Sequence, residues 1–525
     1  MNIEPSYPHF ASAYNQGDAQ VLSVSLPADM DTPVAIARKL GVDQPYTALL
    51  ESVENAVQTG RYSMFACQPD RLWKLDNGQV EVADIKTPDE QPAFTPCPVF
   101  SQQADPAGGA DDGALATRDA IFASLDAELA AADLELPDEA PKMCGGLYGY
   151  FGYECVRLGE PRVPDQNNDV LGVPDSLLFR PQLVAVLDNL KSILSIFVVV
   201  RPREGVEAHE AYKHGVERLQ AAVDALGSLP VDNTTASTLT GLPEFESNMS
   251  QEQYEAMVLK AKEYIAAGDI FQVVLSQRFQ APFDLDSFEL YRSLRRVNPS
   301  PFLFHVRMQG YSLVGSSPEI LVRVSDGQVT IRPIAGTRPR QASLREDELM
   351  AAELLADQKE RAEHLMLLDL GRNDVGRVSK IGTVEVTDKM IIERFSHVMH
   401  ITSNVVGQLR EDVGMLEAML AGFPAGTVSG APKIRAMEII HELESDRRSI
   451  YAGSVGFISA KGELNTCIAL RTGIVKDGTL YVQAGAGVVA DSDPTAEHRE
   501  CQAKARALAS AADGAIRQSH GQTPR

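Results

Sequence analysis

Helical and extended patterns of apolar residues alternate along most of the chain. Residues 193–200 (ILSIFVVV) form an apolar run of strand length, and residues 208–226 have apolar positions at helical spacing. Ser250 and Gln253 have the spacing of a capping box, and the apolar positions after them predict a helix that ends at Gly268. The next segment (IFQVVLSQRF) is rich in β-branched and aromatic residues and predicts a strand. The pattern therefore predicts a mixed α and β protein.

Two stretches of low complexity interrupt this pattern. They are residues 101–117 (SQQADPAGGADDGALAT) and residues 229–248, which are rich in Pro, Thr, Asn and Ser. A chain of 525 residues exceeds the size at which one hydrophobic core stops growing. We therefore predict two domains, residues 1–240 and 241–525, with the second stretch as the linker.

Composition and charge narrow the class of protein. The chain is 44% hydrophobic and 23% charged, no apolar run approaches the length of a membrane span, and the N-terminus lacks the features of a signal peptide. Six cysteines without a CxxC pair indicate reduced thiols. A net charge of −24 opposes binding to nucleic acid or anionic membranes. We expect a cytoplasmic protein that binds neither.

The second half carries charged residues and glycines inside apolar runs, which is costly in a purely structural core. Glu360 and Glu363 are three residues apart on a predicted helix, as are Glu497 and Glu500 on another, and carboxylate oxygens suit Mg²⁺. Arg471 closes the apolar run CIALR and calls for an anion. Each feature alone has an ordinary alternative. Acidic pairs on helices are usually solvated, and a GAG sequence such as residues 485–487 is usually a turn or bulge.

Several motifs of this half occur together. They are PIAGTRPR (333–340), ERAEHLMLLDLGRNDVGRV (360–378), HVMH (397–400), GTVSGAPKIRAMEII (426–440), YAGSVGF (451–457), CIALRT (467–472) and QAGAGVVADSDP (483–494). In order and spacing they resemble the chorismate-utilising enzyme family, which includes anthranilate, aminodeoxychorismate, isochorismate and salicylate synthases. The resemblance implies an α+β fold, an α/β sandwich with two large, mostly antiparallel sheets, outer helices and an active site in the cleft between the sheets.

The resemblance also implies roles for individual residues. Glu363 and Glu500 correspond to Mg²⁺ ligands, with Glu360 and Glu497 as supporting carboxylates. His400 corresponds to a residue beside the departing enolpyruvyl group, and Thr427 to a further residue of the substrate site. The positions that correspond to chorismate contacts are Gly336, Thr337, Tyr451, Arg471, Gly485, Ala486 and Gly487.

Two positions separate the reactions within this family. Isochorismate and salicylate synthases carry a lysine that activates water where this chain has Gln272, and an amide is no general base. Aminodeoxychorismate synthases commonly carry PIKGT, whose lysine can form a covalent intermediate, where this chain has Ala335. We therefore expect ammonia to attack directly and pyruvate to be lost, as in the anthranilate synthase reaction. An aminodeoxychorismate synthase is the nearest alternative.

Two further segments resemble the tryptophan site of feedback-inhibited members of the family. They are LLES (49–52) and NPSPFLF (298–304), although the family usually has Tyr-Met where this chain has Phe302 and Leu303. The positions implied to hold L-tryptophan are Leu50, Glu51, Ser52, Pro301, Phe302 and Leu303. Residues 1–240 would then be regulatory and residues 241–525 catalytic, and a tryptophan sensor without catalytic activity is an alternative from another class.

Ammonia is expected to come from a second protein. No cysteine lies in the GxCxGxQ context of a glutamine amidotransferase nucleophile. The resemblance therefore implies a separate glutamine amidotransferase subunit, and an α₂β₂ heterotetramer is the usual assembly of the family.

Overall fold

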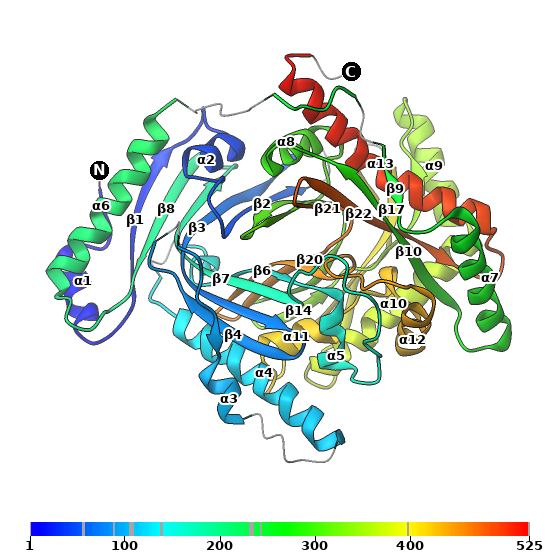
Figure 1. Ribbon diagram of the computed structural model, residues 1–525, viewed down its shortest axis with the longest axis horizontal. Helices are drawn as coiled ribbons and strands as arrows, with labels where there is room; N and C mark the ends of the chain where they lie inside the picture. The colour runs from blue at the N-terminus through cyan, green and yellow to red at the C-terminus, as the bar shows by residue number, and fades with distance from the viewer. Residues whose placement is uncertain are drawn as a thin grey trace.

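Two long antiparallel strands, β3 (Gln58–Asp76) and β7 (Ser176–Asp188), form the centre of the fold in the computed structural model (Figure 1). Their register runs from Tyr62 opposite Asp188 to Leu75 opposite Ser176. The structure describes residues 2–54, 58–87, 90–103, 110–136, 140–229, 236–241, 244–395 and 398–522. Two arms of antiparallel strands extend from the β3–β7 pair in different directions.

The first arm leaves β3 through β2 and continues in the order β2, β11, β12, β21, β22 and β10. Short strands β9 and β18 pair with β10 at the end of this arm. The bounds are β2 (Thr47–Glu54), β11 (Phe302–Arg307), β12 (Tyr311–Ser317), β21 (Thr472–Lys476), β22 (Thr479–Val488), β10 (Gln272–Pro282), β9 (Glu246–Ser247) and β18 (Gly430–Ala431).

The second arm leaves β7 through β6 and continues in the order β6, β19, β20, β13, β14 and β17. Strands β15 and β16 both pair with β17 at its end. The bounds are β6 (Gly146–Phe151), β19 (Ser454–Ser459), β20 (Glu463–Ile468), β13 (Ile320–Ser325), β14 (Gln328–Ile331), β17 (Val398–Gln408), β15 (Ile334–Pro339) and β16 (Glu385–Arg394).

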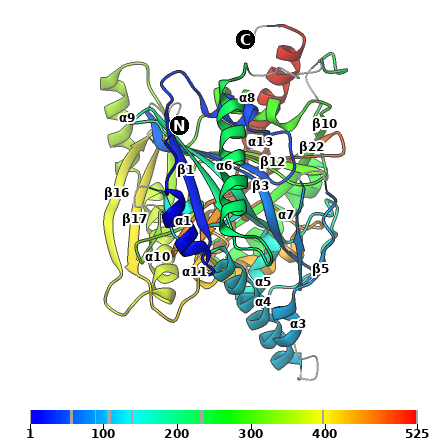
Figure 2. The same cartoon turned by 90° about the vertical axis from the view of Figure 1, so that its left-hand side faces the viewer.

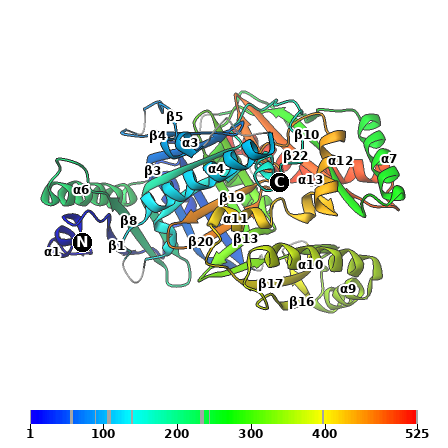
Figure 3. The same ribbon diagram turned by 90° about the horizontal axis from the view of Figure 1, so that it is seen from below.

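The remaining strands flank the central pair: β8 (Ile193–Val200) and β1 (Gln20–Pro27) beside β7, and β4 (Gln79–Asp84) and β5 (Thr95–Pro96) beside β3. Within the described residues, hydrogen bonds join all 22 strands into one network. The predicted α+β class is confirmed, and the two expected sheets are two arms of this network. Figure 3 shows β16 and β17 along one side of the molecule and β10 and β22 along the other.

Helices cover the outer faces of both arms. Their bounds are α1 (Tyr7–Tyr14), α2 (Pro33–Lys39), α3 (Pro98–Gln103), α4 (Ala110–Ala132), α5 (Val156–Gly159), α6 (Ala208–Gly227), α7 (Gln251–Ala267), α8 (Ser287–Val297), α9 (Leu344–Ala356), α10 (Gln358–Val378), α11 (Met415–Ala421), α12 (Lys433–Leu443) and α13 (Pro494–Ser519), with short 3₁₀ turns η1 (Lys142–Cys144), η2 (Tyr153–Cys155) and η3 (Gly426–Val428). Helix α10 packs on β15 and β17, and α13 packs on β22. None of the described helices is both long and apolar enough to cross a membrane.

Local signals in the sequence correctly located several elements. The capping box at Ser250 and Gln253 is present at the start of α7, and Gly268 ends this helix with φ of +84°. The predicted apolar run and the helix after it are β8 and α6. The prediction for residues 101–117 was wrong in part, because 110–117 form the start of α4, while 104–109 lie outside the described residues. Of the predicted linker, 230–235 and 242–243 also lie outside them.

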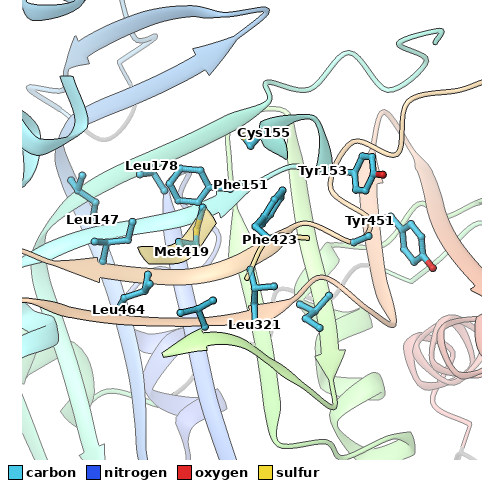
Figure 4. Close-up of a cluster of buried hydrophobic side chains, with 14 of the residues drawn as sticks. Leu147, Phe151, Tyr153, Cys155, Leu178, Leu321, Met419, Phe423, Tyr451 and Leu464 are labelled. Carbon is cyan, nitrogen blue, oxygen red and sulfur yellow. The ribbon is translucent and has the colours of Figure 1, made fainter. Parts of the chain in front are cut away.

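Helix α11 fills the space beside the strands of the second arm. Its Met419 is fully buried, and the hydroxyl of Ser454 in β19 contacts the Met419 sulfur at 3.6 Å. Figure 4 shows Phe151, Met419 and Leu464 in this cluster, with Tyr451 at its end. The apolar core therefore reaches the loop that carries Tyr451. The predicted domain boundary near residue 240 stays a prediction, and strands from both halves of the chain share one sheet through β2–β11 and β6–β19.

Candidate active site

Both predicted pairs of carboxylates lie on helices near the ends of the two arms. Glu360 and Glu363 are in the first turns of α10, and Glu497 and Glu500 are in the first turns of α13. Each helix begins with an aspartate whose side chain accepts hydrogen bonds from backbone N–H groups, as the loss of intrahelical partners at a helix start requires. The two helices therefore present their acidic residues from fixed N-terminal ends.

The carboxylates differ in their partners. Glu360 accepts a hydrogen bond of 2.9 Å from Arg338, and Glu500 forms an ion pair of 2.8 Å with Lys504. Glu363 has no ion pair within the described residues and accepts only a long hydrogen bond of 3.4 Å from the amide of Gln272. Glu363 is therefore the carboxylate with free coordination capacity.

Glu363 and Glu500 are close enough to influence one another. Burial raises the pKa of Glu363, and repulsion from Glu360 and Glu500 raises it further. Burial likewise raises the pKa of Glu497, with a contribution from Glu500. Negative charges gathered from two helices in this way favour a cation between them.

Gln272 begins β10 and is buried. Its amide nitrogen donates to Glu363, while its amide oxygen is buried without a hydrogen-bond partner among the described residues. An unpaired buried carbonyl oxygen costs about 1–3 kcal/mol. An oxygen in this state beside a carboxylate fits a site that a cation or its bound water completes.

The described residues contain no group of three or more His, Cys, Asp or Glu side chains that could hold a metal ion by themselves. Mg²⁺ usually keeps several water molecules and takes one or two protein carboxylates together with oxygen atoms of a substrate. Glu363 and Glu500 are therefore the residues that could hold a Mg²⁺ ion.

The glycines of β22 lie where a side chain would collide with neighbours. Gly485 is opposite Ser276 of β10, and a Cβ there would lie 2.7 Å from the hydroxyl oxygen of Tyr451 and 2.9 Å from a backbone oxygen. A Cβ at Gly487 would lie 2.7 Å from the amide nitrogen of Gln272. Ala486 between them is fully buried and faces the core. Both glycines therefore allow close packing around Tyr451 and Gln272.

Arg471 lies between β20 and β21 with φ of +48°, an uncommon conformation for a residue with a side chain. Burial lowers the pKa of its guanidinium group. No ion pair or side-chain hydrogen bond of Arg471 is present within the described residues. A largely desolvated and unpaired guanidinium fits a carboxylate ligand, which it can bind through two parallel hydrogen bonds.

His400 of β17 faces β15 at an irregularity in the ladder. Gly336 at this bulge has φ of +70°, and the next residue, Thr337, is opposite His400. The Nδ1 atom of His400 lies 3.0 Å from the Thr337 hydroxyl and 3.0 Å from the Gly336 carbonyl oxygen, and its ring packs edge-on against Phe395. His397 of the HVMH motif lies outside the described residues.

The two arms meet at this site. Burial, together with the positive charge of Arg471, lowers the pKa of His400 to about 4, although the hydrogen bond to Gly336 opposes this shift. Arg471 lies in the loop that joins β20 of the second arm to β21 of the first. The hydrogen bond between Gln272 of the first arm and Glu363, on a helix packed against the second, also links the arms. The structure therefore brings together residues from 272 to 500 of the chain.

Thr427 leads to a residue that the sequence analysis missed. Its hydroxyl donates a hydrogen bond of 3.0 Å to Glu319, a buried residue just before β13. Burial raises the pKa of Glu319 to about 8, although hydrogen bonds from Thr427 and the backbone N–H of Ile334 oppose this shift. Glu319 is therefore mostly protonated at neutral pH. A glutamate within the apolar run YSLVGSSPEILVRV was the signal that could have identified it.

The two segments assigned to a tryptophan site are neighbours. Strands β2 and β11 pair so that Ser52 is opposite Phe302 and Glu51 is opposite Leu303, and Leu50 and Pro301 lie next to these pairs in sequence. The carboxylate of buried Glu51 accepts two hydrogen bonds from Arg295, at 2.7 and 2.9 Å, and one from Tyr291. Glu51 thus fixes β2 to α8, and the half-buried side chain of Ser52 is more accessible.

The chain is similar to known proteins over most of its length. A family model described as chorismate binding enzyme matches residues 92–510. Anthranilate synthase component 1 from Cereibacter sphaeroides is 48% identical over 510 residues, which cover 97% of this chain and 98% of the relative. The protein of the same name from Pseudomonas putida is 44% identical over 490 residues, with 92% of each chain covered.

Solved structures are also similar to this chain. The crystal structure of anthranilate synthase component I from Streptococcus pneumoniae has a TM-score of 0.67 and 34% identity, and covers 86% of this chain and 92% of that chain. The menaquinone-specific isochorismate synthase from Escherichia coli has a TM-score of 0.67 at 16% identity, covering 96% of this chain and 97% of that chain. The second likeness concerns the fold alone.

Proposed function

This chain belongs to the chorismate binding enzyme family, and we propose that it converts chorismate and ammonia to anthranilate and pyruvate. It is a chorismate-utilising enzyme, and its relatives named anthranilate synthase component 1 give it the role of the large subunit in tryptophan biosynthesis. The use of Mg²⁺, the source of ammonia and control by tryptophan are further parts of the proposal.

The main support for ammonia as the nucleophile is the presence of glutamine at position 272. Its side chain lies beside Glu363, and the family resemblance assigns this position to the lysine that activates water in isochorismate and salicylate synthases. An amide does not accept a proton at neutral pH, and Ala335, at the position of the lysine in PIKGT, offers no nucleophile for a covalent bond to the ring. Ammonia needs no such activation, because its lone pair is already available as a nucleophile.

Arg471, Gly485 and Gly487 form the proposed substrate site. The guanidinium of Arg471 holds a carboxylate of chorismate, which replaces the water that the buried group has lost. Gly485 and Gly487 let Tyr451 and Gln272 lie close to β22, and these two side chains contact the ring. This arrangement orients the ring between the two arms and excludes water from it.

Two proton transfers complete the reaction. The ring hydroxyl leaves as water after it takes a proton from Glu319, whose pKa of about 8 keeps the carboxyl protonated at neutral pH. Neutral His400 accepts the ring proton that is lost when enolpyruvate leaves and the ring becomes aromatic. Both protons are then returned, because the added ammonium group loses one to Glu319 and the departing enolpyruvate takes one from His400 to become pyruvate. Chorismate and ammonia thus yield anthranilate, pyruvate and water.

Glu363 and Glu500 would hold Mg²⁺, with Glu360 and Glu497 beside them. Support comes from the shared negative potential of these carboxylates and from the unpaired amide oxygen of Gln272. When bound, the ion supplies positive charge to a carboxylate and to the leaving oxygen of the substrate.

A glutamine amidotransferase subunit is the proposed source of ammonia. All six cysteines of this chain are buried and free. Burial raises the pKa of Cys501 to about 11 and that of Cys67 to about 12, and the reactive thiolate is therefore scarce at neutral pH. These cysteines do not suit the hydrolysis of glutamine, which supports a second protein for this step.

Tryptophan is proposed to bind where β2 and β11 pair. Ser52 and residues 301–303 would hold the amino and carboxylate groups, and the apolar side chains nearby would contact the indole. The ion pair between Glu51 and Arg295 would transmit occupation of this site to α8. Helix α8 packs against α13, which carries Glu500.

The test is turnover by the purified chain in the absence of any partner. With chorismate, Mg²⁺ and an ammonium salt at alkaline pH, we expect the blue fluorescence of anthranilate, whereas glutamine in place of ammonium gives none. Accumulation of aminodeoxychorismate without pyruvate, or turnover with glutamine, contradicts the proposal.

A further inference from the structure

A second concave region lies far from the carboxylates, where α6 crosses the ends of the central strands. It is a cavity of about 670 Å³ lined by β3, the end of β8, the loop after it and α6. Figure 2 shows this side of the molecule, with α6 and α1 in front of β1. A volume of this size falls within the range of small-molecule sites in proteins.

The lining of this cavity is positively charged, although the chain as a whole carries a net charge of −24. Four permanent cations line it, opposed by the carboxylates of Asp70 and Glu217. The cations are Lys86, Arg201, Arg203 and Arg218, and His214 is also part of the lining. We call this region the cationic cavity. Its local charge opposes that of the whole molecule, so an anion would be concentrated here.

Asp70 forms ion pairs with two arginines, Arg180 and Arg201, so its single charge offsets theirs only in part. One of its carboxylate oxygens accepts a hydrogen bond of 2.7 Å from Arg180, outside the cavity. The other oxygen lies 3.5 Å from Arg201, a separation too long for a good hydrogen bond. The Nε and Nη1 atoms of Arg201 are buried and have no hydrogen-bond partner among the described residues.

Unpaired N–H groups of a buried guanidinium are costly, because the group has lost its water without gaining a partner. Burial and the neighbouring charge of Arg180 lower the pKa of Arg201 to about 10. Arg201 therefore adds to the lining a positive charge that the shared carboxylate of Asp70 offsets only in part.

Among the arginines of the cationic cavity, Arg218 has a structural role. Arg218 of α6 donates to Gln68 of β3 at 3.0 Å and to the backbone of Val199 at 3.4 Å, which holds the helix on the sheet. Lys86 and Arg203 are exposed, and neither has an ion pair with described residues. They remain available at the rim.

From these contacts we propose that the cationic cavity binds a small, multiply charged oxyanion, either a phosphate ester or a polycarboxylate. Arg201 attracts it through its positive charge at the wall of the cavity. Lys86 and Arg203 bind the same ligand from the rim, and Arg218 keeps α6 in place. This site is independent of chorismate turnover.

Titration calorimetry of the full chain with inorganic phosphate and with citrate tests this proposal, at ionic strength held constant with sodium chloride. We expect saturable binding of at least one anion. Stronger binding of phosphate identifies a phosphate ester as the ligand class, and stronger binding of citrate identifies a polycarboxylate. Arg201→Gln and Arg203→Gln should each weaken binding at least tenfold.

Arg345→Gln is the matched control, since Arg345 is an exposed arginine on α9, at the opposite end of the molecule from α6 (Figure 1). It should bind the anion like the unmodified chain. Arg203 is exposed, so its variant tests the site even where Arg201→Gln fails to fold. Absence of saturable heat with both anions, or equal affinities in Arg203→Gln and Arg345→Gln, overturns the proposal.

Discussion

The Nδ1 atom of His400 lies 3.0 Å from the carbonyl oxygen of Gly336 in the adjacent strand. A carbonyl oxygen only accepts hydrogen bonds, so the neutral imidazole carries its proton on Nδ1. The Nε2 atom is then left with a free lone pair. The bulge at Gly336 thus fixes the form of histidine that can take a proton from a substrate.

His400→Asn should keep a donor for the Gly336 carbonyl but lose the base. We expect kcat to fall by about 10²–10⁴-fold, the usual contribution of a general base. Because the pKa of His400 is lowered to about 4, the base is deprotonated above that pH. The unmodified enzyme should therefore show no loss of kcat/KM near pH 6.5 from this residue.

Steady-state rates of anthranilate formation between pH 5 and 8, at constant free ammonia, measure both effects. His441→Asn, at a half-buried histidine of α12, is the control and should retain activity. A decline of kcat/KM centred near the ordinary histidine pKa that disappears in His400→Asn would refute the neutral form proposed here.

The raised pKa of Glu319 predicts a loss of activity on the alkaline side of the pH profile. Its pKa is raised to about 8, and it donates a proton only while protonated, so kcat/KM should fall as the pH rises through about 8 at constant free ammonia. Thr427→Val removes a hydrogen bond that stabilises the carboxylate, so this limb should move to higher pH. Thr95→Val, at a surface threonine of β5, should leave it unchanged. A shift to lower pH in Thr427→Val would contradict the assignment.

Local and distant features of the site differ in how far the sequence predicts them. The spacing of Glu360 with Glu363 and of Glu497 with Glu500 placed each pair on one helix, because helix starts have local signals such as the Asp493-Pro494 pair where α13 begins. The proximity of Gln272 to Glu363 depends on how the ends of two sheet arms meet. No local pattern contains that information.

Contacts between strands distant in sequence also determine the role of some residues. Ser52 and Phe302 are opposite one another in adjacent strands, although 250 positions separate them in the chain, and only a family resemblance connected the two segments. Glu319 was overlooked because its unusual pKa arises from burial by strands distant in sequence. The identity of a residue does not reveal that environment.

The glycines of β22 give a paired prediction about packing. In Gly485→Ala the new methyl group meets a backbone oxygen at 2.9 Å as well as Tyr451, and neither the strand nor the buried ring has room to move. Such overpacking costs about 1–3 kcal/mol, and KM for chorismate should rise about tenfold or more. Gly487→Ala meets only the end of the Gln272 side chain, which can rotate, so its effect should be smaller. Thermal melting and chorismate kinetics of both variants measure this order, and a larger defect in Gly487→Ala would contradict it.

Metal dependence tests the two acidic helices. Glu363→Gln and Glu500→Gln should each raise the Mg²⁺ concentration for half-maximal activity by about 10–100-fold, since each removes a charged oxygen ligand. Direct binding of Mn²⁺, followed by electron paramagnetic resonance, should weaken in parallel. Glu346→Gln changes an exposed glutamate at the start of α9 and should affect neither measurement. Unchanged Mn²⁺ affinity in both site variants would remove these residues from the metal site.

Ser52→Ala tests the proposed tryptophan site. Loss of one hydrogen bond to a charged group of the ligand costs about 1.5–3 kcal/mol, so the tryptophan concentration for half-maximal inhibition should rise about tenfold or more while kcat is retained. Ser25→Ala in β1 is a control with the same chemical change. Inhibition curves that coincide for the two variants would place tryptophan elsewhere.

The central claim is that this chain aminates chorismate and releases pyruvate. Its most direct test is the mass of the products formed by the purified chain from chorismate, Mg²⁺ and ¹⁵N-labelled ammonium, separated by liquid chromatography. We predict ¹⁵N-anthranilate and pyruvate in equal amounts. Labelled aminodeoxychorismate without pyruvate, or unlabelled isochorismate, would contradict the account.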